Sequence, residues 1–278
     1  MNFRKRAFRA RELYKEYRCA KLNLLFLVGE TASVDEGMRA YLKHVNAPSW
    51  NSDAGTAVEL LPEEFGRLCY RSWEPGLNPN VKRVRKGNKQ YLAHILEVKH
   101  GSVLEHPVVN FIFADVSRVF THELVRHRVG VAISQESLRF VRLEDLGQWL
   151  PTVIRENEQA VEIFGNTFRH LEGLQIRLAE LFRLDDPGVP FAVKKVITSA
   201  MRRIAPIGLA TTIGWSANPR TIRWVLEMRT HPSAEEEIRL VFGKVGEIVI
   251  KRYPNLFGDF TVAVEDGLPW YQPKNSKV

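Results

Sequence analysis

The chain has 278 residues, of which 45% are hydrophobic, and a formal net charge of +8. This is enough apolar sequence for a buried core, and the lack of any run of about 18 uncharged apolar residues excludes a membrane-spanning helix. The two cysteines, Cys19 and Cys69, form no CxxC pair, which argues against a thiolate zinc site and fits a reducing cytoplasm.

The positive charge is concentrated at the start of the chain. Residues 1–21 hold eight Lys/Arg and two Glu, and the remaining sequence is nearly neutral. The glutamates and the lack of a small-residue cleavage site argue against a secretory signal. A nucleic-acid reader would carry its basic stripe on the folded body. We therefore expect a basic extension over 1–21, either solvated or an oligomer contact, followed by one domain over 22–278.

The first hundred residues predict one strand and three helices. LNLLFLVGE, residues 22–30, is a short apolar run typical of a buried strand. Helical spacing follows over 35–45, over 61–73 with Pro62 at its first position, and over 90–101 with Gly101 as its C-terminal cap. Residues 74–89 are rich in Pro, Gly and Asn and carry five cations, which indicates a basic loop.

The rest of the chain alternates strands with long helices. HPVVNFIFADV (106–116) is apolar on nearly both faces and predicts a central strand, and ATTIGWSAN (210–218) predicts another. Helical spacing predicts helices over 117–128, 153–183, 189–203, 218–232 with Asn218 as cap and Pro219 first, and 233–253 with Ser233 and Glu236 as a capping box. This helix-rich mixed order, without repeats or linkers, favours a single α+β domain.

Several common catalytic motifs are missing. The sequence contains no GxSxG, no Walker loop and no GxGxxG after a strand, so the usual hydrolase, P-loop and dinucleotide folds lack support. The histidines never form HExxH, and they are spread over predicted helices, loops and strands. We therefore expect no metal site.

Cations and hydroxyls gather after the helix predicted over 117–128. Arg126, His127 and Arg128 end that helix, and Gln135, Ser137 and Arg139 follow. One positive charge would suit the helix macrodipole, but three charges followed by this loop exceed that need. Forked arginine donors and serine hydroxyls bind phosphate, so the pattern predicts a site for one or two phosphates.

Two further helix ends carry arginine. On the helix from Pro219, the residues Ile222, Val225 and Leu226 form an apolar face that ends at Arg229. Arg229 either reaches solvent past the helix end or points into a ligand pocket beside the first cation cluster. Arg202 ends another helix. Together, the three helix ends predict a site for polyanionic small molecules.

Residues 55–245 resemble the flavin-dependent thymidylate synthases. The resemblance rests on four ordered elements, which are HGSVLEHPVVNFIFADVSRVFTHELVRHR (100–128), SQESLR (134–139), RRIAP (202–206) and WSANPRTIRWVLEMR (215–229). It implies an antiparallel sheet flanked by long helices and a homotetramer with active sites between subunits. It also implies methylation of dUMP to dTMP, with methylenetetrahydrofolate as carbon donor, FAD as hydride carrier and NADPH as reductant.

Positions matching the family motifs imply specific roles. The residues implied to hold FAD are Ser102, Arg126, His127, Arg128, Asn218 and Arg220. Those implied to bind dUMP are Gln135, Ser137, Arg139 and Arg202, with Glu123 near the nucleotide. Arg229 would contact the uracil and polarise it, and His100 would lie beside the flavin ring. Ser137 could also be a nucleophile, but no general base adjoins it in sequence, so we favour a phosphate ligand.

The sequence departs from the family pattern at several positions. Glu123 replaces a glutamine, where a carboxylate would repel a phosphate unless protonated or paired. The loop over 128–139 is one residue longer, with Val129-Gly130-Val131 in place of a serine. Trp224, Ser233, Glu235 and Phe140 also differ from the residues common in the family. These departures leave two alternatives, a diverged flavoprotein acting on another nucleotide, and a non-enzymatic nucleotide- or nucleic-acid-binding protein that uses the basic extension.

Overall fold

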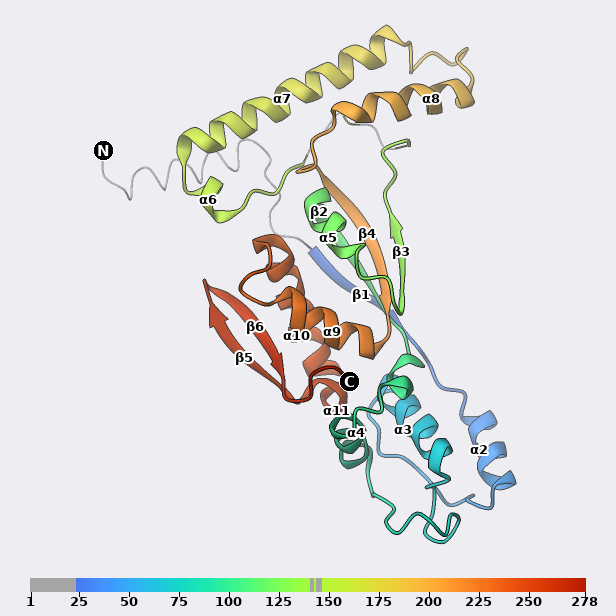
Figure 1. Ribbon diagram of the computed structural model, residues 1–278. Helices are drawn as coiled ribbons and strands as arrows, with labels where there is room; N and C mark the ends of the chain where they lie inside the picture. Colours follow the sequence, from blue (N-terminus) through green and yellow to red (C-terminus); the bar gives the residue numbers. More distant parts are fainter. Residues whose placement is uncertain (1–23, 141–142, 144–146) are drawn as a thin grey trace. The chain divides into compact units, whose positions relative to one another are not determined.

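The computed structural model describes residues 24–140, 143 and 147–278 (Figure 1). The basic extension predicted over 1–21 lies outside the described residues, so its boundary stays a prediction. The chain forms two compact units. The first unit comprises the described residues within 24–26, 112–126 and 133–214, and the second comprises 27–111, 127–132 and 215–278.

The strands form two sheets. One sheet has the order β1 (Leu24–Glu30), β2 (Val109–Ser117), β4 (Ala210–Ala217) and β3 (Val131–Gln135). The other is the antiparallel hairpin of β5 (Phe260–Glu265) and β6 (Leu268–Pro273) in the second unit. The predicted central position of β2 and the strand at β4 are confirmed, whereas β3, β5 and β6 were not predicted. Mixed helix and antiparallel sheet confirm the predicted α+β class.

The prediction that the first strand is buried is wrong. β1 occupies an edge of its sheet, and its residues alternate between exposed and half-buried. Leu24, Phe26 and Val28 are 45%, 48% and 55% exposed. An edge strand has one neighbour, and the described residues cover only one of its faces. A continuous apolar run in the sequence therefore does not distinguish a buried central strand from an edge strand with one exposed face.

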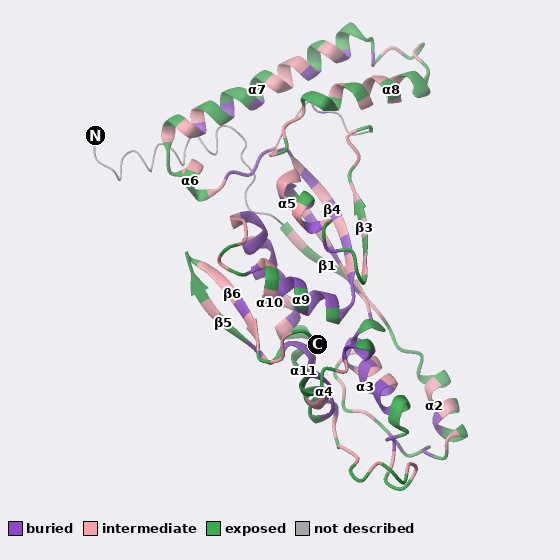
Figure 2. Cartoon of the chain, in the orientation of Figure 1, coloured by how far each residue is buried: buried purple, intermediate pink, exposed green. Residues whose placement is uncertain are grey.

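Seven helices belong to the second unit, which are α2 (Asp35–His44), α3 (Ala57–Tyr70), α4 (Asn88–Glu97), η1 (Gly101–Glu105), α9 (Pro219–Arg229), α10 (Glu236–Arg252) and α11 (Pro254–Phe257). Figure 2 shows α9 and α10 as largely buried. The predicted apolar face of α9 is confirmed, because Ile222, Val225 and Leu226 are completely buried. Asn218 caps α9 as predicted, and its side chain accepts a hydrogen bond from the backbone N–H of Thr221 at 2.9 Å.

Three predicted helix ends in this unit are wrong. α3 begins at Ala57 because Thr56 accepts the Glu59 N–H and caps it, so Pro62 lies inside the helix. α4 ends before Gly101, and Lys99 takes the left-handed conformation there with a φ of 57°. α10 is capped by Glu235, which accepts two backbone N–H groups. The capping side chains of Thr56 and Glu235 determine the two helix starts more strongly than Pro62 or Ser233.

The first unit contains α5 (Arg118–Leu124), α6 (Thr152–Arg155), α7 (Glu158–Leu181), α8 (Phe191–Met201) and η2 (Arg202–Ile204). The helix predicted over 153–183 divides in two, because Asn157 caps α7 through the Ala160 N–H. Gln175 of α7 donates to the Met201 carbonyl at the end of α8. α5 is shorter than predicted and ends at Leu124, which leaves the cation cluster in the following irregular segment. No helix in either unit, as far as the structure describes them, is long and apolar enough to cross a membrane.

Candidate active site

The predicted site residues fall into two groups, one in each unit. The second unit holds His100, Ser102, His127, Arg128, Asn218, Arg220 and Arg229. The first unit holds Glu123, Arg126, Gln135, Ser137, Arg139 and Arg202. The residues implied to hold the flavin thus lie mainly in the second unit, and those implied to bind the nucleotide lie mainly in the first.

Arg229 and His127 form the central contact of the second unit. Arg229 is the last residue of α9, and its Nε donates a hydrogen bond to Nε2 of His127 at 2.7 Å. His127 is 4% exposed. The ring of Trp224 lies edge-on to the imidazole, with centroids 4.9 Å apart. Of the two alternatives for Arg229, the structure therefore favours the one that directs it toward the Arg-His-Arg cluster.

This contact determines the protonation of His127. A guanidinium nitrogen only donates, so Nε2 accepts, and the neutral ring carries its proton on Nδ1. Burial, and then the nearby charge of Arg229, lower the pKa of His127 to about 4. The Nδ1 atom is buried and has no hydrogen-bond partner among the residues that the structure describes. A buried N–H without a partner costs free energy, so this donor fits an acceptor atom of a bound group.

Gly130 allows the segment after the Arg-His-Arg cluster to lie close against the start of α9. Its φ is +69°, and a Cβ there would lie 2.4 Å from Nδ2 of Asn218 and 2.5 Å from Oγ1 of Thr221. The carbonyl of Gly130 accepts the Asn218 N–H at 3.2 Å, and that of Val129 accepts the Thr221 hydroxyl at 2.8 Å. The glycine that departs from the family pattern therefore allows a close backbone approach that a larger residue would prevent.

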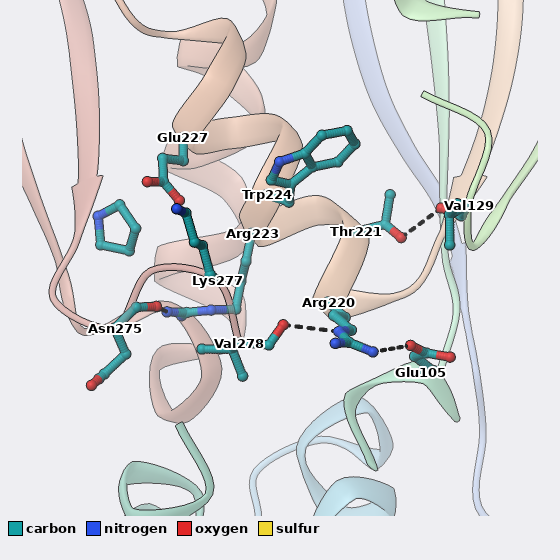
Figure 3. Close-up of a pocket in the computed structure, with 11 residues that line it drawn as sticks. Glu105, Val129, Arg220, Thr221, Arg223, Trp224, Glu227, Asn275, Lys277 and Val278 are labelled. Carbon is teal, nitrogen blue, oxygen red and sulfur yellow. Dashed lines mark hydrogen bonds and ion pairs between the residues drawn. The ribbon is translucent and has the colours of Figure 1, made fainter. Parts of the chain in front are cut away.

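A cavity of about 430 Å³ opens beside the outer face of α9 (Figure 3). Arg220, Thr221 and Trp224 line it from the helix, and Glu105 and Val278 line it from other segments of the unit. The Arg220 guanidinium donates to Glu105 at 2.5 Å and to the Val278 carbonyl at 2.8 Å. A ligand that binds Arg220 must therefore share it with these two acceptors or displace them.

The remaining flavin residues of this unit do not line that cavity. His100 precedes η1, and its ring forms an edge-to-face contact with Tyr70, with centroids 5.7 Å apart. Ser102 lies on η1 and is exposed, as is Arg128. The unit thus offers cations, an indole ring and an unpartnered Nδ1–H around α9. This donor set fits a large aromatic cofactor that carries phosphates, such as FAD.

The predicted phosphate loop is held by side chains of the first unit. The Gln135 amide donates to Oγ1 of Thr121 on α5 at 3.1 Å. The hydroxyl of Thr198 on α8 donates to the Arg139 carbonyl at 2.8 Å, and the Arg139 N–H approaches Oγ of Ser137 at 3.4 Å. Ser137 is half-buried and the Arg139 side chain is exposed. The loop therefore presents the cation and the hydroxyl from an anchored backbone.

Arg118, at the start of α5, belongs to this group and was missed in the sequence. One of its terminal nitrogens donates to the Glu136 carbonyl at 3.1 Å, while its buried Nε has no hydrogen-bond partner among the described residues. Burial, and then the like charge of Arg202, lower the pKa of Arg118. The two cations therefore repel each other, and a bound anion would relieve this repulsion. The available signal was an arginine directly after the Ser117 helix cap.

The other predicted residues of this unit lie at its surface. Glu123 is half-buried on the last turn of α5, and its carbonyl accepts the Arg126 N–H at 3.3 Å. The side chains of Arg126 and Arg202 are exposed. Phe140 stacks on Phe191 of α8, with centroids 6.2 Å apart, so the ring that replaces a tyrosine has an apolar partner.

Two departures in the second unit have structural roles. Ser233 does not cap α10, because its hydroxyl and N–H bond to Nδ1 of His231 at 2.8 and 3.1 Å. Glu235 supplies that cap through its carboxylate.

Among the residues described, no three His, Cys, Asp or Glu side chains are grouped as metal ligands would be.

Comparison with known proteins decides the family. The family described as "Thymidylate synthase complementing protein" matches residues 55–255. The chain belongs to this family. The match includes the four motif elements in which the sequence resembles flavin-dependent thymidylate synthases.

Individual members of the thymidylate synthase complementing family agree. The chain is 33% identical to the flavin-dependent thymidylate synthase of Mycobacteroides abscessus over 216 residues, which cover 77% of this chain and 84% of that protein. It is also 33% identical to the enzyme of the same description from Corynebacterium diphtheriae, again over 77% of this chain and 84% of that one.

Solved structures share the fold. Thymidylate Synthase X from Helicobacter pylori, with FAD and dUMP, matches with a TM-score of 0.56 and 19% identity, over 86% of this chain and 98% of that one. The UMP/dUMP methylase PolB from Streptomyces cacaoi, bound with 5-Br UMP, matches with a TM-score of 0.58 and 16% identity, over 86% and 94% of the two chains. At these identities the likeness establishes the fold alone.

Proposed function

We propose that this protein is a flavin-dependent thymidylate synthase that methylates dUMP to dTMP. Methylenetetrahydrofolate would supply the carbon and NADPH the reducing equivalents. Membership of the family supports this reaction, and one structural observation in this chain is its main support. The two motifs that the reaction needs, Arg-His-Arg and the α9 arginine, meet in the hydrogen bond from Arg229 to His127.

The second unit would hold the FAD. When bound, the FAD would supply the hydride for reduction of the transferred carbon. His127 would donate from Nδ1 to an acceptor of the cofactor, and Arg128, Asn218 and Arg220 would surround its phosphates. Ser102 would add a hydroxyl and His100 would lie beside the flavin ring. Arg126 of the first unit is proposed for the same group.

The first unit would bind the dUMP phosphate. Ser137, Arg139 and Arg202 provide the hydroxyl and forked donors that suit a phosphate. Arg118 and Gln135 fix the loop on α5, because they contact the Glu136 carbonyl and Thr121 respectively. Arg229 would contact the uracil and stabilise negative charge that develops on it. Ser137 is proposed as a phosphate ligand rather than as a nucleophile.

We also propose a cytoplasmic homotetramer. The two groups of site residues lie in separate units of one chain, and active sites shared between subunits would let different chains contribute the two groups. Analytical ultracentrifugation would measure the assembly state, and a tetramer that dissociates with loss of flavin would support shared sites.

The direct test is formation of dTMP by the purified protein. The reaction should require dUMP, methylenetetrahydrofolate, FAD and NADPH, and should stop when any one is omitted. The Arg229→Gln variant should retain flavin while losing most turnover, since its proposed charge acts on the uracil. Wild-type protein that binds FAD and dUMP but forms no dTMP under these conditions would contradict the proposal.

Glu123 favours a second candidate, a family member that acts on another nucleotide. This carboxylate lies on the last turn of α5 in the unit proposed to bind the phosphate. Glu123→Gln removes the negative charge, and a changed affinity for dUMP would show that this carboxylate acts on the phosphate. Glu180→Gln, an exposed position on α7, is the matched control. Unchanged dUMP affinity together with turnover of a different nucleotide would favour this second candidate.

A further inference from the structure

A second basic cavity lies in the second unit, apart from the residues assigned above except His100. It measures about 360 Å³, and its walls include Lys82, Arg83 and Arg85. The aromatic rings of Tyr70 and Tyr91 line it as well. No carboxylate is among its lining residues, within the part of the chain that the structure describes. Three cations within four residues therefore face a common space without an acidic partner on its walls.

The loop that carries these cations is anchored rather than loose. Arg67, which is 2% exposed, donates from Nη2 to the Arg85 carbonyl at 2.9 Å and to Glu63 at 2.6 Å. Its guanidinium also packs over the Tyr91 ring, 4.4 Å from the centroid. At the far end of the loop, the Asn88 N–H is bound by Asp53 at 2.6 Å. A buried ion pair and a helix start thus hold the loop backbone at the cavity.

His100 connects this cavity with the proposed flavin site. It lines the cavity, and its ring forms an edge-to-face contact with Tyr70. Its Nδ1 is buried and has no hydrogen-bond partner in the described residues. Since His100 is the residue expected beside the flavin ring, a substrate that reacts at the flavin could extend along the tyrosines to Lys82 and Arg83.

We propose that this cavity binds the glutamate tail of the folate co-substrate. The inference rests on the proposed function, in which methylenetetrahydrofolate reacts beside the flavin. A folate consists of a pterin, an aminobenzoyl ring and one or more glutamates. The tyrosine rings suit the aminobenzoyl group, and the three cations suit the carboxylates.

Within the described part of the chain, the cavity lacks the helix start that commonly holds the phosphates of a nicotinamide dinucleotide. The backbone N–H groups at the start of a helix commonly bind the phosphates of dinucleotides. α4 begins at Asn88, but its first three residues do not line the cavity, which it meets with Tyr91, His94, Ile95 and the following Val98. The side-chain cations Lys82, Arg83 and Arg85 are therefore the anion-binding groups of the cavity.

The test compares two double variants of equal charge change. Lys82→Gln/Arg83→Gln removes two cavity cations, whereas Lys86→Gln/Lys89→Gln removes two exposed cations of the same region that do not line the cavity. Calorimetry would measure binding of 5-formyltetrahydrofolate with one and with several glutamates to the FAD-loaded protein with dUMP. NADPH binding would be measured in parallel.

The cavity variant should bind the folate with several glutamates roughly three- to tenfold more weakly than wild type, as expected for loss of two solvent-accessible ion pairs. The folate with one glutamate should lose less, and the control variant should match wild type. Both variants should keep the flavin spectrum. If the two variants bind both folates equally well, or if only NADPH binding weakens, the inference is overturned.

A separate ligand keeps this test independent of the proposed function. An aminobenzoyl oligoglutamate needs no flavin, so its binding to wild type and its weakening in the cavity variant would support the cavity even if no dTMP is formed. Equal affinity for the cavity and control variants would overturn the inference even if the protein makes dTMP.

Discussion

Arg229 donates its Nε–H to Nε2 of His127 across 2.7 Å, and this bond joins the end of α9 to the Arg-His-Arg cluster. The two residues are far apart in sequence, and each was a candidate on separate grounds. Burial, and then the charge of Arg229, keep the imidazole neutral, and the bond leaves Nδ1–H as its donor. It also means that a change at Arg229 acts on the proposed flavin site through His127.

Arg229→Gln should raise the pKa of His127. Its present value of about 4 arises first from burial and then from the charge of Arg229. Removing the charge removes the second cause only, so the pKa should rise but stay below the ordinary value of about 6.5. NMR titration of the His127 Cε1–H would measure it. Arg220→Gln, which removes a cation without a contact to His127, is the control, and equal titration in both variants would refute the coupling.

His127 should make the protein less stable in acid. Its pKa is about 4 in the folded protein and about 6.5 when unfolded, so the unfolded chain binds more protons between these values. Its contribution is therefore fully present above pH 6.5 and is lost as the pH falls to 4. The loss is on the order of 3 kcal/mol by linkage.

Glu64 has the opposite effect on stability in acid. The effect of His127 must therefore be measured as the difference in unfolding free energy between wild type and a His127 variant. Burial, and then repulsion from Glu63, raise the pKa of Glu64 to about 7, which favours the folded state as the pH falls through 7. Denaturant unfolding of wild type and of His127→Gln at several pH values separates the two. The difference in unfolding free energy should shrink from pH 7 to pH 4, and a constant difference would contradict the assignment.

Gly130→Ala should destabilise the protein more than Gly76→Ala. Both glycines have positive φ, +69° and +89°, so both variants incur backbone strain. Only the Gly130 methyl would collide with Asn218 and Thr221, because nothing lies within 4 Å of a Cβ at Gly76. We expect the Gly130 variant to be about 2 kcal/mol less stable than the Gly76 variant, a difference of roughly 4–8 °C in Tm. Equal melting temperatures would show that the close approach of Gly130 to α9 does not contribute to the free energy of unfolding.

Arg118→Gln should weaken binding of dUMP. Its guanidinium supports the loop through the Glu136 carbonyl and lies near Arg202. Loss of a charge-assisted contact of this kind would raise the Kd by about tenfold. Arg203→Gln is a suitable control, because Arg203 is the exposed neighbour of Arg202 and its guanidinium donates to the Ser199 carbonyl. If dUMP binds equally to both variants, Arg118 has no part in the site.

Local patterns predicted most helices and the central strands but not the ends that depend on a particular cap. Thr56 and Glu235 determine the starts of α3 and α10 by accepting backbone N–H groups, and the sequence offered Pro62 and Ser233 as competing signals. The exposure of β1 depends on which strands and helices lie beside it, a tertiary property that an apolar run does not contain.

The candidate site was predictable where the motif itself carries the chemistry. The apolar face of α9 correctly placed Arg229 at the end of a buried stripe, although its partner His127 could not be identified from spacing within one helix. The role of Arg118 could not be predicted from the local sequence, because it depends on the position of Arg202, which is more than eighty residues later in the chain. The role of Gly130 similarly depends on contacts with α9.

The measurement that tests the central claim most directly is the visible absorption spectrum of the FAD-loaded protein before and after addition of dUMP. Our account predicts a bound-flavin spectrum that dUMP perturbs, because flavin and nucleotide meet in one active site. A protein that takes up no FAD, or a bound-flavin spectrum that saturating dUMP leaves unchanged, would contradict it.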